Sequence, residues 1–253
     1  MSDLDTKAEA LLADLKPTSP SAAPGQNFLP PHTRRDVPGQ YGSTPIWRAG
    51  EGPAALFVHG WDDTHRIWRH FAQDFLQNTR PVLLMDLPSH GASKVEYCTP
   101  ETASVSVAET CAAEGPIDTI IAHSFGCEAT VRAIAAGAHA DYLVLIAPPL
   151  LDWADYQHLK GHDDETITRA RELLAERGGE IMSRVDFREA LADYKGAILL
   201  VGSQADESSP LPLIRELANG LASAKLVEDD TLSHRDIALD PRILSEITTF
   251  LGY

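Results

Sequence analysis

Short apolar segments alternate with helix-like segments through most of the chain, and this alternation constrains the fold more than any other feature. The patterns predict strands at 54–59, 81–86, 119–123, 142–147, 197–202 and 224–228, and helices at 67–77, 103–113, 125–136, 210–221 and 243–251. Apolar strands joined by helices are typical of a parallel sheet that is covered on both faces. Two more strands are predicted at 32–37 and 44–48. The predicted fold class is α/β, with a mostly parallel central sheet.

The spacing of these elements predicts one main domain with two additions. Residues 1–31 begin with a helix-like stretch and continue as a segment rich in Pro, Ser and Ala, which predicts a flexible N-terminal arm. The domain itself covers 32–253, a length that one core can serve. The interval 148–195 is too long for a simple loop and contains helical patterns at 164–177 and 187–194. Long connections of this kind are usually functional, so we expect a small helical cap there.

Charge and composition exclude several classes of partner. The chain has 21 Lys and Arg against 37 Asp and Glu, a formal charge of −16, which repels nucleic acid and anionic lipid surfaces. No apolar run is long enough to cross a membrane. The first residues are acidic and no apolar signal region follows them, so a cytoplasmic location is expected. No C-x-x-C or H-E-x-x-H motif occurs, and no metal site is predicted.

The most informative motif is the apolar segment that leads through Ala122-His123-Ser124-Phe125-Gly126 into a predicted helix. A serine at such a sharp strand-to-helix turn exposes its hydroxyl at the carboxyl edge of the sheet. The alternative is that Ser124 only caps the helix, as serine often does. His123 is expected to pack rather than to act in catalysis, because its side chain points away from the hydroxyl.

A nucleophilic serine needs a base, and the base needs a third group that orients it. Asp206 follows the apolar strand at 197–202, and His234 follows the next predicted strand. The order Ser, Asp, His agrees with a triad in which Asp206 holds His234. Asp152, which follows the preceding strand, is the competing acid.

Acyl transfer also requires donors for the developing oxyanion, and backbone N–H groups usually supply them. After the nucleophile, the N–H of Phe125 is the first candidate. The second is the N–H of Trp61, in a segment where His59-Gly60 ends a strand and glycine provides backbone freedom. His59 is expected to brace this loop through hydrogen bonds. A plain strand terminator would explain His-Gly equally well.

Together these motifs resemble the α/β-hydrolase superfamily over roughly residues 32–253. The resemblance is carried by His59-Gly60-Trp61, 86–91 (Asp-Leu-Pro-Ser-His-Gly), 122–126, 201–206 and Ser233-His234. The chain departs from the family at Cys127, where Gly or Ala is common, and at Ser89, which replaces a usual glycine. The resemblance implies an α/β-hydrolase fold and a nucleophile elbow.

The predicted function is that of a cofactor-independent, carboxylesterase-like serine hydrolase. Ser124 attacks a small-molecule acyl substrate, an acyl-enzyme forms, and water releases it. Members of the superfamily that resemble haloalkane dehalogenases or epoxide hydrolases have an aspartate at the elbow. The serine here argues against both of these activities. Trp153 and Tyr156 in the cap are candidate substrate-binding residues, although helix packing explains them equally well.

Two other classes of function stay open at this point. The chain could be a non-catalytic binding or signalling protein on the same scaffold, because a fold does not dictate a function. It could also act mainly as an assembly partner through residues 1–31. The oligomeric state does not follow from the sequence.

Overall fold

The computed structural model describes residues 2–13, 17–18, 28–30, 32–177 and 185–253. The chain divides into two compact units. The larger unit comprises the described residues of Ser19–Leu150 and Val185–Tyr253, and the smaller unit those of Met1–Thr18 and Leu151–Arg184. Most of the Pro- and Ser-rich part of the predicted arm, at 14–16 and 19–27, lies outside the described residues.

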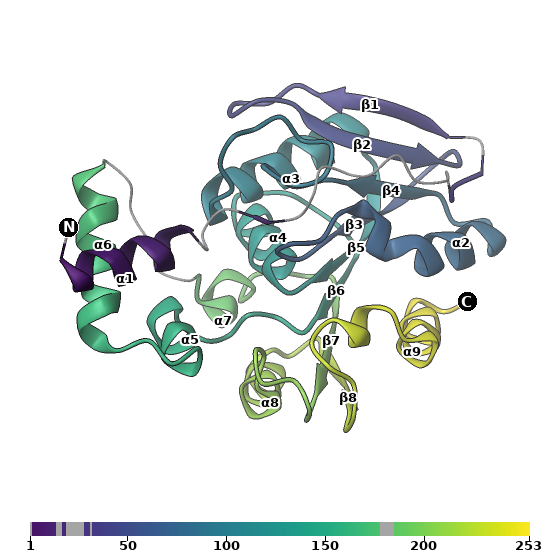
Figure 1. Cartoon of the computed structure of the whole chain (residues 1–253). Coiled ribbons are helices and arrows are strands. Elements are labelled where there is room, and N and C mark those ends of the chain that lie inside the picture. Colours follow the sequence, from purple (N-terminus) through teal and green to yellow (C-terminus); the bar gives the residue numbers. More distant parts are fainter. Residues whose placement is uncertain (1, 14–16, 19–27, 31, 178–184) are drawn as a thin grey trace. The chain divides into compact units, whose positions relative to one another are not determined.

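The larger unit is built on an eight-stranded sheet in the order β1-β2-β4-β3-β5-β6-β7-β8 (Figure 1). The pairs β1–β2 and β2–β4 are antiparallel, and every later neighbour is parallel. Parallel strands put their carboxyl ends at one edge, and the loops that follow them meet there. The strands are β1 Thr33–Val37, β2 Thr44–Ala49, β3 Ala54–Val58, β4 Val82–Met85, β5 Ile117–His123, β6 Tyr142–Ile146, β7 Ala197–Ser203 and β8 Ala224–Asp229.

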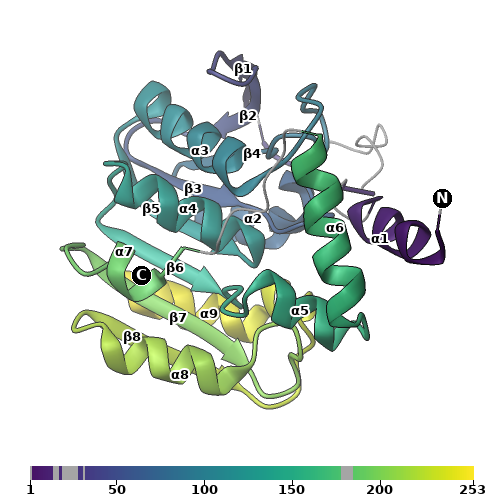
Figure 2. The same cartoon turned by 90° about the vertical axis from the view of Figure 1, so that its left-hand side faces the viewer.

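Two hydrophobic cores lie on opposite faces of this sheet, because successive strand side chains point to opposite sides. In β3, Leu56 belongs to one core and Phe57 to the other. The first core is covered by α3 Pro100–Glu114, α4 Phe125–Ala135, α7 Phe187–Ala190 and α8 Leu211–Gly220. The second is covered by η1 His65–Trp68, α2 Arg69–Gln77, η2 Asp236–Ala238 and α9 Pro241–Leu251, and Figure 2 shows the two layers.

The smaller unit contains α1 Asp3–Ala13, α5 Trp153–Leu159 and α6 Asp164–Glu176. Helices α1 and α6 bury apolar residues against each other, and α5 contributes partly buried side chains. No residue of this small core belongs to the cores of the sheet. The buried set is Ala8, Leu11, Leu12, Ile167, Ala170 and Leu173.

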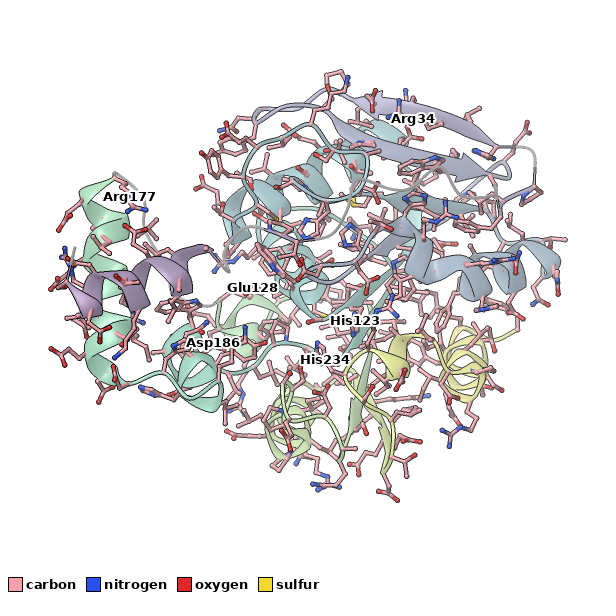
Figure 3. The ribbon with its side chains drawn as sticks, viewed as in Figure 1. Arg34, His123, Glu128, Arg177, Asp186 and His234 are labelled. Atoms are coloured by element: carbon pink, nitrogen blue, oxygen red, sulfur yellow. The ribbon has the colours of Figure 1, made fainter. Side chains whose placement is uncertain are left out.

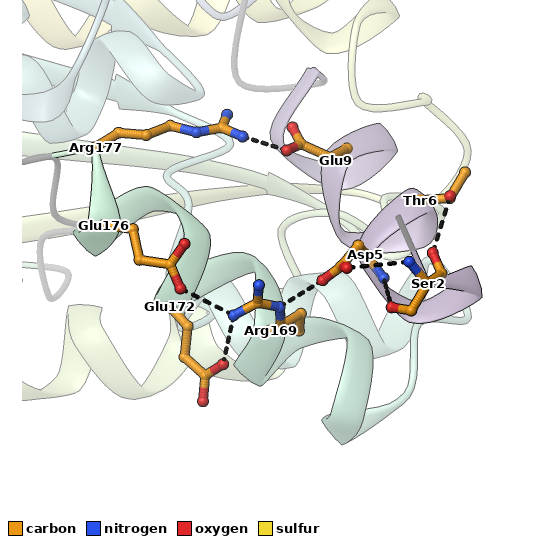
Figure 4. Close-up of polar contacts among 8 residues, drawn as sticks. All are labelled: Ser2, Asp5, Thr6, Glu9, Arg169, Glu172, Glu176 and Arg177. Atoms are coloured by element: carbon orange, nitrogen blue, oxygen red, sulfur yellow. Dashed lines mark hydrogen bonds and ion pairs between the residues drawn. The ribbon is translucent and has the colours of Figure 1, made fainter.

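Charged side chains also join α1 to α6 (Figure 4). Arg169 donates to Asp5 at 2.7 Å, and Arg177 pairs with Glu9. The hydrogen bond from Arg169 lowers the pKa of Asp5 to about 2. Arg169 is itself held by Glu172 and Glu176 of the same helix, at 3.0 and 3.1 Å. Part of the predicted arm is therefore a helix that packs on the cap insertion.

Replacing Leu11 with alanine is expected to loosen α1 from α6. The side chain is only 2% exposed, and truncating a buried leucine costs about 2–5 kcal/mol. Amide hydrogen exchange in α1, measured by mass spectrometry, should then become about 30-fold faster or more, because about 2 kcal/mol corresponds to a factor of about 30. The matched control is Lys7→Ala in the same helix, whose exposed amine pairs with Asp3, and which should leave exchange close to that of the parent. Equal exchange in both variants would contradict the packing role of Leu11.

The predicted fold class is confirmed, and several element boundaries differ from the predicted ones: α3, for example, begins at Pro100 and β5 at Ile117. Residues 185–195, placed in the cap by sequence, belong to the larger unit, because Phe187 and Leu191 are buried in a core of the sheet. Helix α5 was not predicted, and 67–77 divides into the end of η1 and α2. Among the described residues, no helix combines the length and apolar character needed to cross a bilayer.

Candidate active site

Ser124 stands at the turn between β5 and α4, in a backbone conformation that L residues rarely adopt. Its φ is 50° and its ψ is −125°, a strained combination. The turn is this sharp because α4 begins directly against β3: a Cβ at Gly126 would lie 2.5 Å from the carbonyl oxygen of His59. The Ser124 side chain makes no capping hydrogen bond to α4. The hydroxyl is therefore available for another partner.

This strain predicts that Ser124→Gly is more stable than Ser124→Ala. Both variants lose the hydroxyl, but only glycine adopts the required φ and ψ without steric cost. Strain relief of about 1–3 kcal/mol is partly offset by the greater freedom of glycine in the unfolded chain, so we expect a net difference of about 1 kcal/mol. Urea denaturation at equal m-values measures it. A less stable glycine variant would show that the turn is not strained.

The side chains of Ser124, His234 and Asp206 form one line of hydrogen bonds. Ser124 Oγ lies 2.8 Å from His234 Nε2, and His234 Nδ1 lies 2.7 Å from Asp206 Oδ2. A carboxylate can only accept, so Nδ1 carries the proton and Nε2 accepts from the hydroxyl. In this tautomer, Nε2 is the nitrogen that faces the Ser124 hydroxyl as an acceptor.

The carboxylate of Asp206 is buried and held in place from the side opposite His234. Its Oδ1 accepts the backbone N–H groups of Ser208 and Ser209, at 2.9 and 3.1 Å. Ser209 Oγ in turn donates to the carbonyl of Ala147, after β6. These contacts leave Oδ2 for the imidazole.

Asp152, the competing acid, has a different role in the structure. Its carboxylate accepts from the N–H of Ala154 at 2.8 Å and caps α5. It also lies 3.7 Å from the guanidinium of Arg171. Both partners belong to the smaller unit, whereas the acid bonded to His234 is Asp206.

The loop that carries Trp61, the second candidate oxyanion donor, packs against Ser124. A Cβ on Gly60 would lie 3.0 Å from the Cβ of Ser124, so a larger residue here would require its neighbours to shift. The rings of Trp61 and Phe125, the two residues whose N–H groups are candidate donors, meet edge to face at 5.2 Å. Phe125 begins α4, and its N–H has no acceptor within the helix. Both backbone segments therefore border Ser124.

Buried histidine side chains form hydrogen bonds with the loop that follows β3. His59 Nδ1 donates to the carbonyl of Gly60 at 2.7 Å while its Nε2 accepts the N–H of Leu87, and burial lowers the pKa of His59 to about 4. His90 Nε2 accepts the N–H of Asp62 at 3.2 Å. The neutral imidazoles thus connect the loop after β3 to the loop after β4.

Asp86 is the buried acid of this network, and sequence reasoning gave it no role. It accepts from the N–H of His65 at 2.7 Å, from His65 Nδ1 at 2.8 Å and from the N–H of Ala92 at 2.8 Å. Burial acts to raise the pKa of Asp86, but the hydrogen bonds from His65 outweigh it, and the pKa is lowered. The motif at 86–91, which begins with Asp86, was the sequence feature that could have indicated this buried role. Ser89, its unusual residue, has a φ of 63° and donates to the carbonyl of Glu96.

The candidate substrate-binding residues lie on α5. Arg171 stacks over Trp153 with its guanidinium carbon 5.4 Å from the ring centroid, and Lys160 lies 5.0 Å from the ring centroid of Tyr156. Trp153 also packs against the α1–α6 core. For Trp153, this contact is the helix packing that was the alternative to substrate binding. Within the described ranges, no group of three or more His, Cys, Asp and Glu side chains is arranged to hold a metal ion.

The fold and the site define a class: a mostly parallel α/β sheet with a strained serine at a strand-to-helix turn and a histidine bonded to its hydroxyl. The family model described as "Alpha/beta hydrolase family" matches residues 55–246. The chain belongs to this family, which confirms the resemblance drawn from the motifs. No curated protein matches the chain in sequence.

Solved structures with the same fold include several esterases. An esterase from Pyrococcus furiosus, Pf2001, superposes with a TM-score of 0.70 at 16% identity, over 92% of this chain and 97% of that one. The esterase RhEst1 from Rhodococcus sp. ECU1013 superposes with a TM-score of 0.68 at 18% identity, over 87% and 98% of the two chains. A bacterial membrane phospholipase A superposes with a TM-score of 0.67 at 17% identity, over 87% of this chain and 86% of that one. At these identities the likeness shows the fold.

Proposed function

We propose that the chain is a serine hydrolase that cleaves a carboxylic ester or a related acyl bond. Its membership of the α/β-hydrolase family supports hydrolase activity in general. The observation that carries the finer assignment is the pair of hydrogen bonds from Ser124 to His234 and from His234 to Asp206, at 2.8 and 2.7 Å. These distances fit an Nδ1–H that faces the carboxylate and an unprotonated Nε2 that faces the hydroxyl, which is the arrangement that acyl transfer requires.

In the first half of the proposed reaction, Ser124 Oγ attacks the substrate carbonyl carbon and passes its proton to His234 Nε2. The negative charge that develops on the carbonyl oxygen is stabilised by the N–H groups of Phe125 and Trp61. Asp206 stabilises the imidazolium through Nδ1–H. The tetrahedral intermediate then collapses, the bond to the alcohol breaks, and the alcohol leaves with the proton from His234.

In the second half, a water molecule gives a proton to His234 and attacks the acyl carbon. The bond to Ser124 Oγ breaks, the serine regains its proton, and the carboxylic acid is released. The strongly acidic chain favours uncharged substrates over anionic ones. Selection of the substrate by Trp153 and Tyr156 stays a prediction.

A fluorophosphonate probe tests this proposal, because it phosphonylates only a serine that is activated by a base. We expect one phosphonyl group per chain, and a peptide map should place it on Ser124. Labelling at another serine, or no labelling of folded protein, would overturn the proposal. In the second case, the non-catalytic binding protein weighed from the sequence becomes the better explanation.

A further inference from the structure

A second histidine lies buried beside the nucleophile, and the proposed reaction does not use it. His123 is the last residue of β5 and is only 3% exposed. Its Nε2 lies 2.8 Å from the backbone carbonyl of His234, and the two rings have centroids 5.0 Å apart (Figure 3). The contact therefore joins the residue before the nucleophile to the main chain of the catalytic base.

The geometry determines which nitrogen of His123 carries the proton. A carbonyl oxygen can only accept, so Nε2–H donates to it and Nδ1 is unprotonated. Nδ1 is buried without a hydrogen-bond partner among the described residues, and a Cβ on Gly60 would lie 3.0 Å from it. Burial, together with the nearby charge of His234, lowers the pKa of His123 to about 3. The neutral His123 ring therefore donates one hydrogen bond, from Nε2–H to the carbonyl of His234.

The segment that carries His234 is held by local hydrogen bonds, in which Leu232 N–H donates to Asp229 and Ile237 N–H donates to the carbonyl of Ser233. These bonds involve neither the carbonyl nor the ring of His234. His234 lies between β8 and η2, in a part of the chain without regular secondary structure, and its side chain is 29% exposed. On the outer side, Arg235 pairs with Asp63 at 2.9 and 3.0 Å, but the arginine side chain is 60% exposed. Exposed ion pairs hold their partners weakly. The hydrogen bond from His123 reaches the same segment from the buried side.

We propose that His123 is a positioning residue for the catalytic base, and that its Nε2–H bond to the carbonyl of His234 holds the imidazole between Ser124 and Asp206. Its effect on catalysis rests on the proposed serine hydrolase function, whereas its effect on the geometry of His234 does not. A displacement of about 1 Å in a reacting group can lower a rate by about 100-fold. A single buried donor at the backbone of the base can therefore control the rate.

Two substitutions separate the donor from the bulk of the ring. His123→Gln keeps an N–H donor that reaches a similar distance from Cβ, whereas His123→Phe keeps a planar ring and removes the donor. If only the packing of the ring matters, the phenylalanine variant should keep the higher kcat. If the hydrogen bond matters, the glutamine variant should keep the higher kcat. Thermal unfolding of both variants shows that each one folds.

The variants are compared on a p-nitrophenyl ester and by proton NMR of His234. We expect His123→Phe to lower kcat by about 100-fold with KM within about twofold, and His123→Gln to retain kcat within about threefold of the parent. The Nδ1 proton of His234, in its short bond to Asp206, resonates at low field. That resonance should broaden or vanish in His123→Phe and persist in His123→Gln.

The NMR measurement separates this proposal from the proposed function. If the parent protein turns over no ester but His123→Phe still loses the His234 resonance, the hydrolase proposal fails and the positioning role stands. If His123→Phe keeps both the resonance and kcat, or if glutamine restores neither, the positioning role is refuted. A rise in KM at constant kcat would also refute it, because that result indicates a binding role.

Discussion

Ser124→Ala is expected to reduce kcat for ester hydrolysis by about 10⁵-fold or more while the protein stays folded. The loss is this large because, in the proposed reaction, the serine oxygen forms the covalent intermediate, and His234 has no other hydroxyl bonded to Nε2 in the described structure. Steady-state assays with p-nitrophenyl esters measure it, with circular dichroism as the check on folding. Phosphonylation by the fluorophosphonate probe should be lost in parallel.

Ser245→Ala is the matched control for this variant, since it removes a hydroxyl from an exposed residue of α9. Its kcat should equal that of the parent. Turnover by Ser124→Ala at more than a few per cent of the parental rate would mean that another group attacks the substrate.

Asp206→Asn is expected to lower kcat by about 10⁴-fold. The amide nitrogen of asparagine is a donor, and the backbone N–H groups of Ser208 and Ser209 already direct donors at one oxygen position of this side chain. The asparagine oxygen therefore stays with those N–H groups, and its NH₂ group faces His234 Nδ1. The imidazole then takes the opposite tautomer, which places a proton on Nε2 and blocks its role as a base.

Glu207→Gln is the control, because it makes the same change from acid to amide at the neighbouring exposed residue. Its kcat should not change. The tautomer can be read directly from ¹⁵N shifts of the His234 ring: Nδ1 should carry the proton in the parent and Nε2 in Asp206→Asn. A variant that keeps both the parental rate and the parental tautomer would remove Asp206 from the mechanism.

The order of strands and helices in the larger unit could be predicted because each element carries its own local signal. Strands such as β4 and β7 are short apolar runs, and α2 and α9 have one apolar face each. Boundaries were less predictable where tertiary contacts decide them. Helix α7 was assigned to the cap by its position in the chain, but its burial in a core of the sheet places it in the larger unit.

The N-terminal segment shows a second limit of local signals. Its helical pattern was visible, yet the burial of α1 depends on a partner about 160 residues away along the chain. The apolar stripe of α1 and that of α6 are each compatible with a solvent-exposed amphipathic helix. Only the tertiary structure shows that the two cover each other.

In the candidate site, the sequence predicted the residue types and their order along the chain. It did not decide between similar residues. Asp152 and Asp206 come after β6 and β7, which are neighbours in the sheet, so position along the chain does not distinguish the two acids. The hydrogen bond to His234 selects Asp206. Likewise, the sequence showed that His123 precedes the candidate nucleophile Ser124. What the His123 ring contacts depends on where β5 meets the segment after β8.

The sequence by itself determined the α/β class, the family and the candidate nucleophile, because periodicity and short motifs are properties of neighbouring residues. The tertiary structure decided which acid meets His234, how the oxyanion loop approaches Ser124, and what His123 contacts. These depend on distances between residues far apart in the chain, which strand order and packing set. A sequence pattern gives the types of residues and their spacing along the chain. A hydrogen bond forms only when folding brings two particular atoms to within about 3 Å of each other.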